Sequence, residues 1–378
     1  MKTLLIFFFL LFYPATNFSQ EIREYDSLTT ASFSAVGDLI VHGQQLKYAK
    51  IDSLTYEFKP VFREIKQYLQ SADFTMANLE TVFAGIEKGY SGYPSFNTPD
   101  SFLDALKYAG IDFLFTANNH ALDFNRSGLE RTINLLNSSK VGFSGTFLHK
   151  EEKDSIKIIE VNGITFTILS YSYLANKNID KGYEYMLNTI KLGQIRRNIL
   201  KAKSMNLDLV IVYLHFGNEY ENEPSNYQIE TVKSIKSYGA DIILASHTHS
   251  IQPVEMYKPV NSKLDSGFVA YSLGNFISNQ RWRYSDAGVI LNYTIEKNII
   301  NDSLYINDFS FIPTWVYKGN TDNGKEFLIL PAEYYKNELN PPYIKTKDLE
   351  LMKQSFNDTK KIITQKTGRL KLKSILKE

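Results

Sequence analysis

The chain has 378 residues, of which 43% are hydrophobic, and a formal net charge of +1 at pH 7. The apolar content is sufficient for a sizeable core, and the balance of charge excludes a strongly basic nucleic-acid-binding surface and an acidic tail. There is no cysteine, which excludes disulfides, thiolate chemistry and lipid attachment through an N-terminal Cys, so that a metal site has to use His, Asp, Glu and Asn.

Residues 1–20 have the three-part layout of a secretory signal, with Lys2 near the start, an apolar run from Leu4 to Tyr13, and small or polar residues after Pro14. The run has about ten residues, half of the roughly twenty that cross a bilayer. We therefore predict export to the periplasm or the cell exterior, with cleavage near Ser19 or Gln20. Retention of residues 4–13 as a membrane anchor is the alternative, because no clean small-x-small cleavage site follows the run.

The next part of the chain alternates between apolar segments of strand length and amphipathic segments of helical length. The predicted strands are Ser32–Gly37, Phe74–Ala77, Phe113–Thr116, Val141–Ser144, Ile164–Tyr171, Leu209–Leu214, Ile242–Ala245, Phe268–Leu273 and Val289–Thr294. The predicted helices are Pro60–Gln70, Ser101–Ala109, Ser127–Asn137, Gly193–Met205 and Asn226–Tyr238; Ser127 and Glu130 have capping-box spacing. Apolar strands between amphipathic helices predict an α/β fold with a mixed sheet covered on both faces.

From about residue 300 the pattern changes to short strand-like pieces, Leu304–Ile306 and Phe309–Ile312, followed by a predicted helix at Lys347–Gln365 and a basic tail. No linker-like composition separates this part from the rest. We interpret residues 301–378 as a C-terminal extension of a domain that covers residues 30–300.

Side chains of metal-ligand type follow five of the predicted strands. They are Asp38 and His42; Asn78 and Glu80; Asn118, Asn119, His120 and Asp123; His215 and Glu219; and His247 and His249. In open α/β sheets, ligands bind in the crevice outside the carboxyl ends of the strands, so these side chains are expected to converge. Each of them alone has an ordinary interpretation as a turn or core residue, but five coincidences of one kind favour a common site.

His247 and His249 form an H-x-H pair after an apolar strand. In an extended chain both imidazoles lie on the same side, about 7 Å apart at the backbone. Such a pair can ligate one ion, or two ions that share a bridging group. A set of His, Asp, Glu and Asn without Cys fits two divalent ions, Mn, Zn or Fe, about 3.5–4 Å apart and bridged by one carboxylate.

The segments NLE, NNHALDF, LHFGNEY, ASHTHSIQPVE and YSLGNF occur in this order between about residues 32 and 280. With this content and order, the sequence resembles the CapA/PgsA family of poly-γ-glutamate capsule biosynthesis proteins, which have the calcineurin-like metallophosphoesterase fold. The resemblance implies a four-layer sandwich of mixed β-sheets flanked by helices.

The resemblance also implies roles for individual residues. Asp38 and His249 would bind the first metal; Asn119, His215 and His247 the second; and Glu80 would bridge the two. His120 would donate a proton to the leaving group, oriented by Asp123. His42 stands four residues after Asp38, where phosphoesterases have Asp-x-His, and the sequence leaves open whether it reaches the first metal.

Asn97, Glu219, Asn275, Arg281 and Arg283 are candidates for substrate binding, since arginine suits bidentate recognition of carboxylate or phosphate. By resemblance, we expect an exported metal-dependent hydrolase or transferase that acts on phosphoester or amide bonds in an anionic polymer or conjugate, such as polyglutamate or a glycan phosphate. The alternative is a non-catalytic subunit that binds polyglutamate or glycan in a capsule complex with membrane-bound synthase components.

Overall fold

The computed structural model describes residues 27–336 and 341–375. The predicted signal at residues 1–20 lies outside these ranges. Among the helices of the described ranges, none combines the length and the apolar composition that crossing a bilayer requires.

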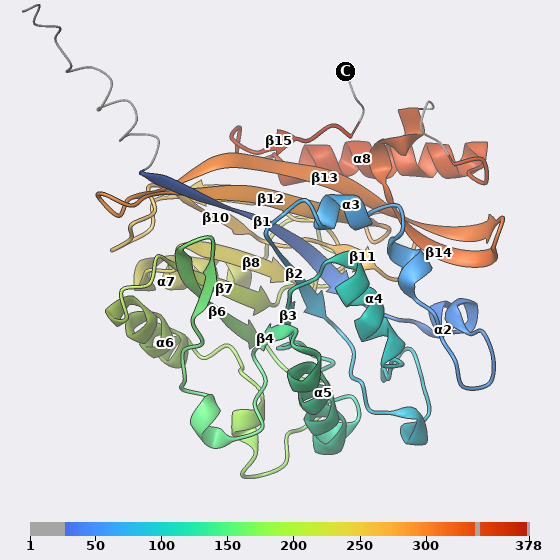
Figure 1. Cartoon of the computed structure of the whole chain (residues 1–378), viewed down its shortest axis with the longest axis horizontal. Helices are drawn as coiled ribbons and strands as arrows, with labels where there is room; N and C mark the ends of the chain where they lie inside the picture. The colour runs from blue at the N-terminus through green and yellow to red at the C-terminus, as the bar shows by residue number, and fades with distance from the viewer. Residues whose placement is uncertain (1–26, 337–340, 376–378) are drawn as a thin grey trace, which may run out of the picture.

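Two β-sheets form the centre of the molecule (Figure 1). The larger sheet contains β1 (Leu28–Leu39), β2 (Phe74–Leu79), β3 (Phe113–Phe115), β4 (Gly142–Ser144), β11 (Asn275–Ile277), β12 (Ala287–Asn298), β13 (Leu304–Thr321), β14 (Gly324–Pro331) and β15 (Lys371–Leu372). Its order is β14-β13-β12-β1-β2-β3-β4, with β11 beside β1 and β15 beside β13. Strands β1 to β4 run parallel, whereas β12, β13 and β14 pair antiparallel.

The second sheet has the order β5-β6-β7-β8-β10-β9. Its strands are β5 (Ile159–Val161), β6 (Ile164–Ser172), β7 (Leu209–His215), β8 (Ile242–Ser246), β9 (Val254–Tyr257) and β10 (Gly267–Ala270). The four central strands run parallel, and β5 and β9 are antiparallel edges. Parallel strands buried on both faces account for the nearly continuous apolar runs of β7 and β8.

The two sheets pack face to face, and helices cover their outer faces. Between the sheets, the rings of Phe115 and Tyr213 stack with centroids 3.9 Å apart. Helices α2 (Gly43–Ala49), α3 (Lys66–Leu69), α4 (Ser101–Ala109) and α5 (Asn125–Ser139) cover the larger sheet, and α6 (Leu192–Ser204) and α7 (Asn226–Tyr238) cover the second. The fold is therefore the α/β four-layer sandwich that the resemblance implies, with two mixed sheets where the strand pattern alone predicts one.

Helix α8 (Thr346–Ile363) packs on β13 and β14 through Met352 and Phe356. It confirms the helix predicted at Lys347–Gln365. The two short strands predicted at Leu304–Ile306 and Phe309–Ile312 are instead parts of the single long strand β13, because β12 and β14 supply backbone partners along it. Strands β5, β9, β11, β14 and β15 were not predicted from the sequence.

Two helix predictions were wrong in detail. The segment Pro60–Gln70 is split into a 3-10 turn at Lys59–Phe62 and the one-turn helix α3. Helix α5 begins at Asn125, so Ser127 lies inside its first turn, where its hydroxyl donates to the carbonyl of Phe124 instead of capping the helix.

Candidate functional site

The polar side chains that follow five strands lie together at one edge of the sandwich. Asp38, Glu80 and Asn119 come from the larger sheet, whereas His215, His247 and His249 come from the second sheet. All six residues are buried. The site therefore spans the junction between the sheets, at the carboxyl ends of their parallel strands.

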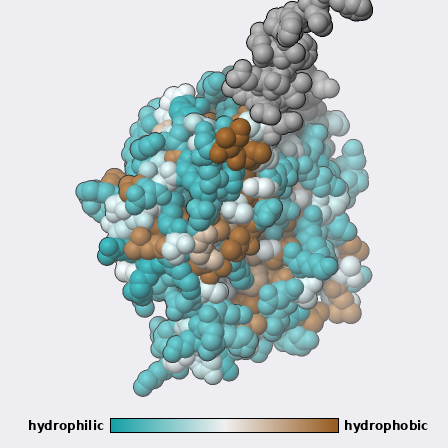
Figure 2. All heavy atoms as spheres, turned by 60° about the vertical axis from the view of Figure 1, so that its left-hand side comes forward, coloured by the Kyte–Doolittle hydropathy of each residue, from teal (hydrophilic) through white to brown (hydrophobic). Residues whose placement is uncertain are grey.

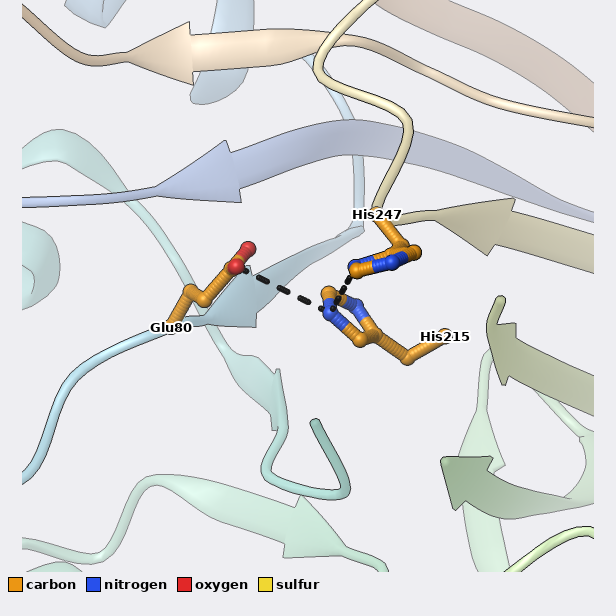
Figure 3. Close-up of side chains that lie close together, drawn as sticks. All are labelled: Glu80, His215 and His247. Carbon is orange, nitrogen blue, oxygen red and sulfur yellow. Dashed lines mark hydrogen bonds and ion pairs between the residues drawn. The ribbon is translucent and has the colours of Figure 1, made fainter. Parts of the chain in front are cut away.

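One group of ligand atoms surrounds the imidazole of His215. Its Nε2 atom lies 2.8 Å from Oδ1 of Asn119, 3.1 Å from Nδ1 of His247 and 3.7 Å from Oε1 of Glu80. Figure 3 shows the two imidazoles and the carboxylate directed toward one another from separate elements. Ligand atoms about 2.1 Å from a tetrahedral ion are about 3.4 Å apart, so the three distances to Nε2 of His215 fit one coordination sphere.

A second group consists of Asp38, Glu80 and His249, whose ligand atoms all lie within 4.8 Å of one another. Oδ2 of Asp38 is 3.3 Å from Nδ1 of His249. Glu80 belongs to both groups, as a carboxylate that bridges two ions would.

The two buried carboxylates are held by a neighbouring amide. The Nδ2 of Asn78 donates to Oδ1 of Asp38 over 2.8 Å and to Oε2 of Glu80 over 3.1 Å. The other oxygens, Oδ2 of Asp38 and Oε1 of Glu80, are buried and have no hydrogen-bond partner within the described residues. Burial, and next the negative charge of Asp38, raise the pKa of Glu80 well above its usual range. Because a bound cation would satisfy these orphaned oxygens, the residues present fit divalent metal ions.

The histidines are in the form that binds metals. Burial lowers the pKa of His215 well below its usual range, and neighbouring imidazoles lower it further. Burial likewise lowers the pKa of His247 to about 3. Both rings are therefore neutral at physiological pH, and a neutral imidazole offers a lone pair to a metal ion.

The H-x-H pair is not extended, which corrects the expectation from sequence. Strand β8 ends at Ser246, and His247 and His249 have φ angles of 104° and 55°. Residues other than glycine rarely adopt this left-handed region, and they do so mainly where the surrounding structure holds them. The turn brings the two rings to a centroid distance of 6.1 Å, with His247 in the group around His215 and His249 beside Asp38.

His42 lines the site without joining either group of ligand atoms. Its Nδ1 accepts a hydrogen bond from the backbone N–H of Asn279 over 3.2 Å. Burial lowers its pKa to about 4, so the ring is neutral and carries its only proton on Nε2. In this tautomer, Nε2 can donate to a ligand in the cavity.

His120 lies beside the metal-ligand groups and is held by Asp123. Nδ1 of His120 is 2.8 Å from Oδ2 of Asp123, which also accepts from the backbone N–H of Phe96 over 2.6 Å. The ring of Phe96 packs against the imidazole at a centroid distance of 4.6 Å. With Nδ1 donating to Asp123, Nε2 is the atom left to exchange a proton.

A cavity of about 440 Å³ opens over these residues. Its lining includes Glu80, Asn119, His120, Asp123, Glu219 and His249 together with five residues that the sequence analysis did not single out: Tyr93, Asn176, Lys177, Tyr220 and Gln280. Among the described lining residues, Lys177 carries the one ammonium or guanidinium group. Its Nζ donates to the backbone carbonyl of Asp123.

The loop that carries Asn176 and Lys177 is fixed to the site. The backbone N–H of Asn176 donates to the carbonyl of Asn119 over 2.8 Å, and its Nδ2 lies 3.4 Å from both ring nitrogens of His120. No periodicity marks this loop in the sequence, and only the folded chain brings it next to β3.

Of the five substrate-binding candidates, Glu219 alone lines the cavity. The side-chain amide of Asn97 is hydrogen-bonded to backbone groups. Its Oδ1 accepts from the N–H of Ala84, and its Nδ2 donates to the carbonyls of Gly85 and Gly89. Asn275 stands behind His249, with its Oδ1 3.2 Å from Nδ1 of that ring. Both are positioned as structural supports.

The side chains of Arg281 and Arg283 also lie outside the cavity lining. Arg283 forms a bidentate ion pair with Asp358 of α8, and Nε of Arg281 donates to the carbonyl of Val316. Residues of the C-terminal region pack against this loop and hold both side chains away from the cavity, an arrangement that the sequence does not predict. Gln280, one residue earlier, is the member of the loop that reaches the cavity.

Comparison with known proteins identifies relatives over most of this region. The family model described as bacterial capsule synthesis protein matches residues 32–280. The chain is 28% identical over 285 residues to the capsule biosynthesis protein CapA of Bacillus anthracis, a match that covers 73% of this chain and 66% of that protein. It is 26% identical over 290 residues to the PGA biosynthesis protein CapA of Bacillus subtilis, covering 74% of this chain and 71% of that one.

Similar solved structures include the NAD nucleotidase of Haemophilus influenzae, with a TM-score of 0.46, 11% identity and coverage of 92% of this chain and 64% of the other. The calcineurin-like phosphoesterase YfkN of Bacillus subtilis has a TM-score of 0.41 and 13% identity, and the alignment covers 88% of this chain and 98% of that one.

Proposed function

This chain belongs to the family of bacterial capsule synthesis proteins, and from that premise we propose that it is an exported hydrolase or transferase that uses two divalent metal ions. The observation that carries the proposal is the pair of ligand groups that share Glu80. Divalent ions bound there would lower the pKa of a water molecule and stabilise negative charge on the oxygens of the bond being cleaved.

The chain's own residues supply proton transfer. Nε2 of His120 donates a proton to the leaving group, while the hydrogen bond between Nδ1 and Asp123 fixes the tautomer and stabilises the imidazolium before transfer. Water contributes its hydroxide to the phosphorus or carbonyl carbon, and its remaining proton returns to solvent or to His120. The bond cleaved is a phosphoester or an amide.

Bound metal ions together with Lys177 would favour an anionic substrate held at two points. Metal ions next to Asp38 and Glu80 would attract the reacting group, and the ammonium of Lys177 binds a second carboxylate or phosphate. Polyglutamate, a γ-glutamyl conjugate and a glycan phosphate all carry such groups. The substrate class is therefore an anionic polymer or conjugate of the cell envelope.

The second candidate function is a non-catalytic subunit that binds such a polymer within a capsule assembly. The placement of His42 outside both ligand groups favours it, because the first group then has three protein side chains and no histidine from the segment after β1. A weak first site would leave one ion, enough to bind a carboxylate but not to activate water between two ions.

Turnover of reporter substrates separates the two functions. Metal-loaded protein is expected to hydrolyse bis(p-nitrophenyl) phosphate or γ-glutamyl-p-nitroanilide, and His120→Gln is expected to reduce kcat while metal content stays unchanged. His149→Gln, at an exposed histidine, is the matched control. Metal-loaded protein that binds oligoglutamate but leaves both reporters intact would establish the binding function instead.

A further inference from the structure

The hairpin between β12 and β13 ends in two adjacent isoleucines that face solvent. Ile299 is 58% exposed and Ile300 is 76% exposed. Leu28, the first residue of β1, pairs with Asn298 and is also exposed. We call Leu28, Ile299 and Ile300 the hairpin tip. In Figure 2 this side of the molecule is turned forward, and hydrophobic patches interrupt its otherwise hydrophilic surface.

The hairpin tip stands where the described chain begins. The backbone N–H of Ile299 donates to the carbonyl of Ser27 over 2.8 Å. Ser27, to which residues 1–26 are joined, therefore lies beside Ile299, and the sequence of residues 1–26 contains the apolar run Leu4–Tyr13. Only residues 14–26 separate that run from the tip, a stretch that spans at most roughly 45 Å when fully extended.

The charges around the hairpin tip balance one another. Lys263 and Lys297 both pair with Asp208 and with Asp302. A surface with exposed aliphatic side chains and compensated charge is not repelled by anionic lipid headgroups, and burial of the aliphatic side chains favours the boundary between headgroups and acyl chains.

We propose that, in the chain that retains residues 4–13 as an anchor, the hairpin tip inserts into the interfacial layer of the same lipid bilayer. Strand β1 then sets the orientation of the whole molecule. Asp38 lies ten residues after Leu28 on β1, about 33 Å away along the strand. The metal-ligand groups at the other end of β1 then lie outside the bilayer, where a substrate in water reaches them.

This inference does not depend on the proposed hydrolysis, because the hairpin tip lies at the opposite end of β1 from the metal-ligand groups. The chain has no cysteine, so one introduced cysteine carries a single fluorophore. Full-length protein would be labelled with an environment-sensitive dye at Ile300→Cys. Leu54→Cys, which replaces a similarly exposed aliphatic residue on the loop after α2, is the matched control.

Both labelled proteins would be added to vesicles of phosphatidylethanolamine and phosphatidylglycerol. We expect a blue shift and quenching by nitroxide-labelled lipid at position 300 and neither at position 54. Ile299→Asp in the labelled chain is expected to abolish the shift at 300, whereas Ile51→Asp leaves it intact. A dye at 300 that stays in water would overturn the inference, whether the protein binds vesicles through another segment or not at all. Metal content, unaffected by Ile299→Asp, reports separately on the proposed function.

Discussion

The side-chain amide of Asn78 donates to Oδ1 of Asp38 over 2.8 Å and thereby links the ends of β1 and β2. The same Nδ2 reaches Oε2 of Glu80, so one neutral amide orients both buried carboxylates. Without that amide, two negative groups would face each other in a buried site with no donor between them. The residue is therefore a support for the ligands and not a ligand itself.

Replacing Asn78 by Asp should make stability depend more strongly on metal ions. The change removes both donated hydrogen bonds and adds a third carboxylate, and we expect metal-free protein to lose about 2–3 kcal/mol of unfolding free energy. Divalent cations should restore most of the loss. Thermal unfolding with and without a chelator measures both effects. Asn198→Asp, at a buried amide of α6 that donates to the Tyr171 hydroxyl and contacts neither carboxylate, should destabilise equally with and without metal.

Replacing Lys177 by Gln should weaken substrate binding without affecting metal content. Loss of a charge-assisted hydrogen bond is worth about 1.5–3 kcal/mol, so KM for an oligoglutamate or phosphorylated glycan should rise about tenfold or more. Kinetics on an uncharged-tail reporter should change little. Lys181→Gln, on the same loop but outside the cavity lining, is the control. An equal rise in KM for both substrates would contradict a role in recognising the second anionic group.

Replacing Gly37 by Ala should displace the backbone at the end of β1 and thereby disturb the metal-ligand groups. A methyl group at this position would overlap the carbonyl oxygen of Gly274, which accepts the backbone N–H of Asp38. We expect a loss of about 1–3 kcal/mol in urea unfolding, together with weaker metal binding. Gly43→Ala, at a glycine of α2 with open space around it, should cause neither change. A stable Gly37→Ala protein with unchanged metal content would show that β1 can shift freely.

We expect deprotonation of Asp286 to lower the stability of the folded protein as pH rises from about 4 to about 6. Burial raises the pKa of this carboxyl to about 6, although Trp315 donates to it over 2.9 Å. Because the folded state binds the proton more tightly than the unfolded state, the group's contribution to stability is full below pH 4 and is lost between pH 4 and 6. Asp286→Asn should therefore gain up to about 3 kcal/mol at pH 7.5 and nothing at pH 4. Urea unfolding at both pH values checks this, and a loss at pH 7.5 would mean that Arg281 stabilises the carboxylate.

The sequence predicts the strands that carry the ligands because their signal is local. Apolar runs such as those of β7 and β8 end in polar side chains, and parallel strands place their carboxyl ends at one edge. Convergence of the strand-end side chains was predicted for a single mixed sheet. Their origin in two different sheets, as for Glu80 and His215, follows from the resemblance, since periodicity does not say how two sheets stack. The left-handed turn at His247 is also invisible in sequence, because neither residue type nor spacing requires it.

The substrate side of the cavity was poorly predicted because it depends on contacts between distant segments. The arginines in the loop after β11 suggested anion binding, but Arg283 forms an ion pair with Asp358, which lies 75 residues later in the chain. Lys177 has no sequence signal of its own, and it reaches the cavity only because Asn176 is hydrogen-bonded to the backbone of Asn119. Side chains placed by strands were predictable, and side chains placed by loop packing were not.

Elemental analysis of bound metal tests the paired ligand groups most directly. Purified wild-type protein, exchanged into metal-free buffer after loading, is expected to retain two divalent ions per chain. Glu80→Ala should lose both, since Glu80 belongs to both groups, whereas His149→Ala should keep them. Wild-type protein that retains no ion, or Glu80→Ala protein that retains as many as wild type, would contradict a bridged metal pair at the junction of the two sheets.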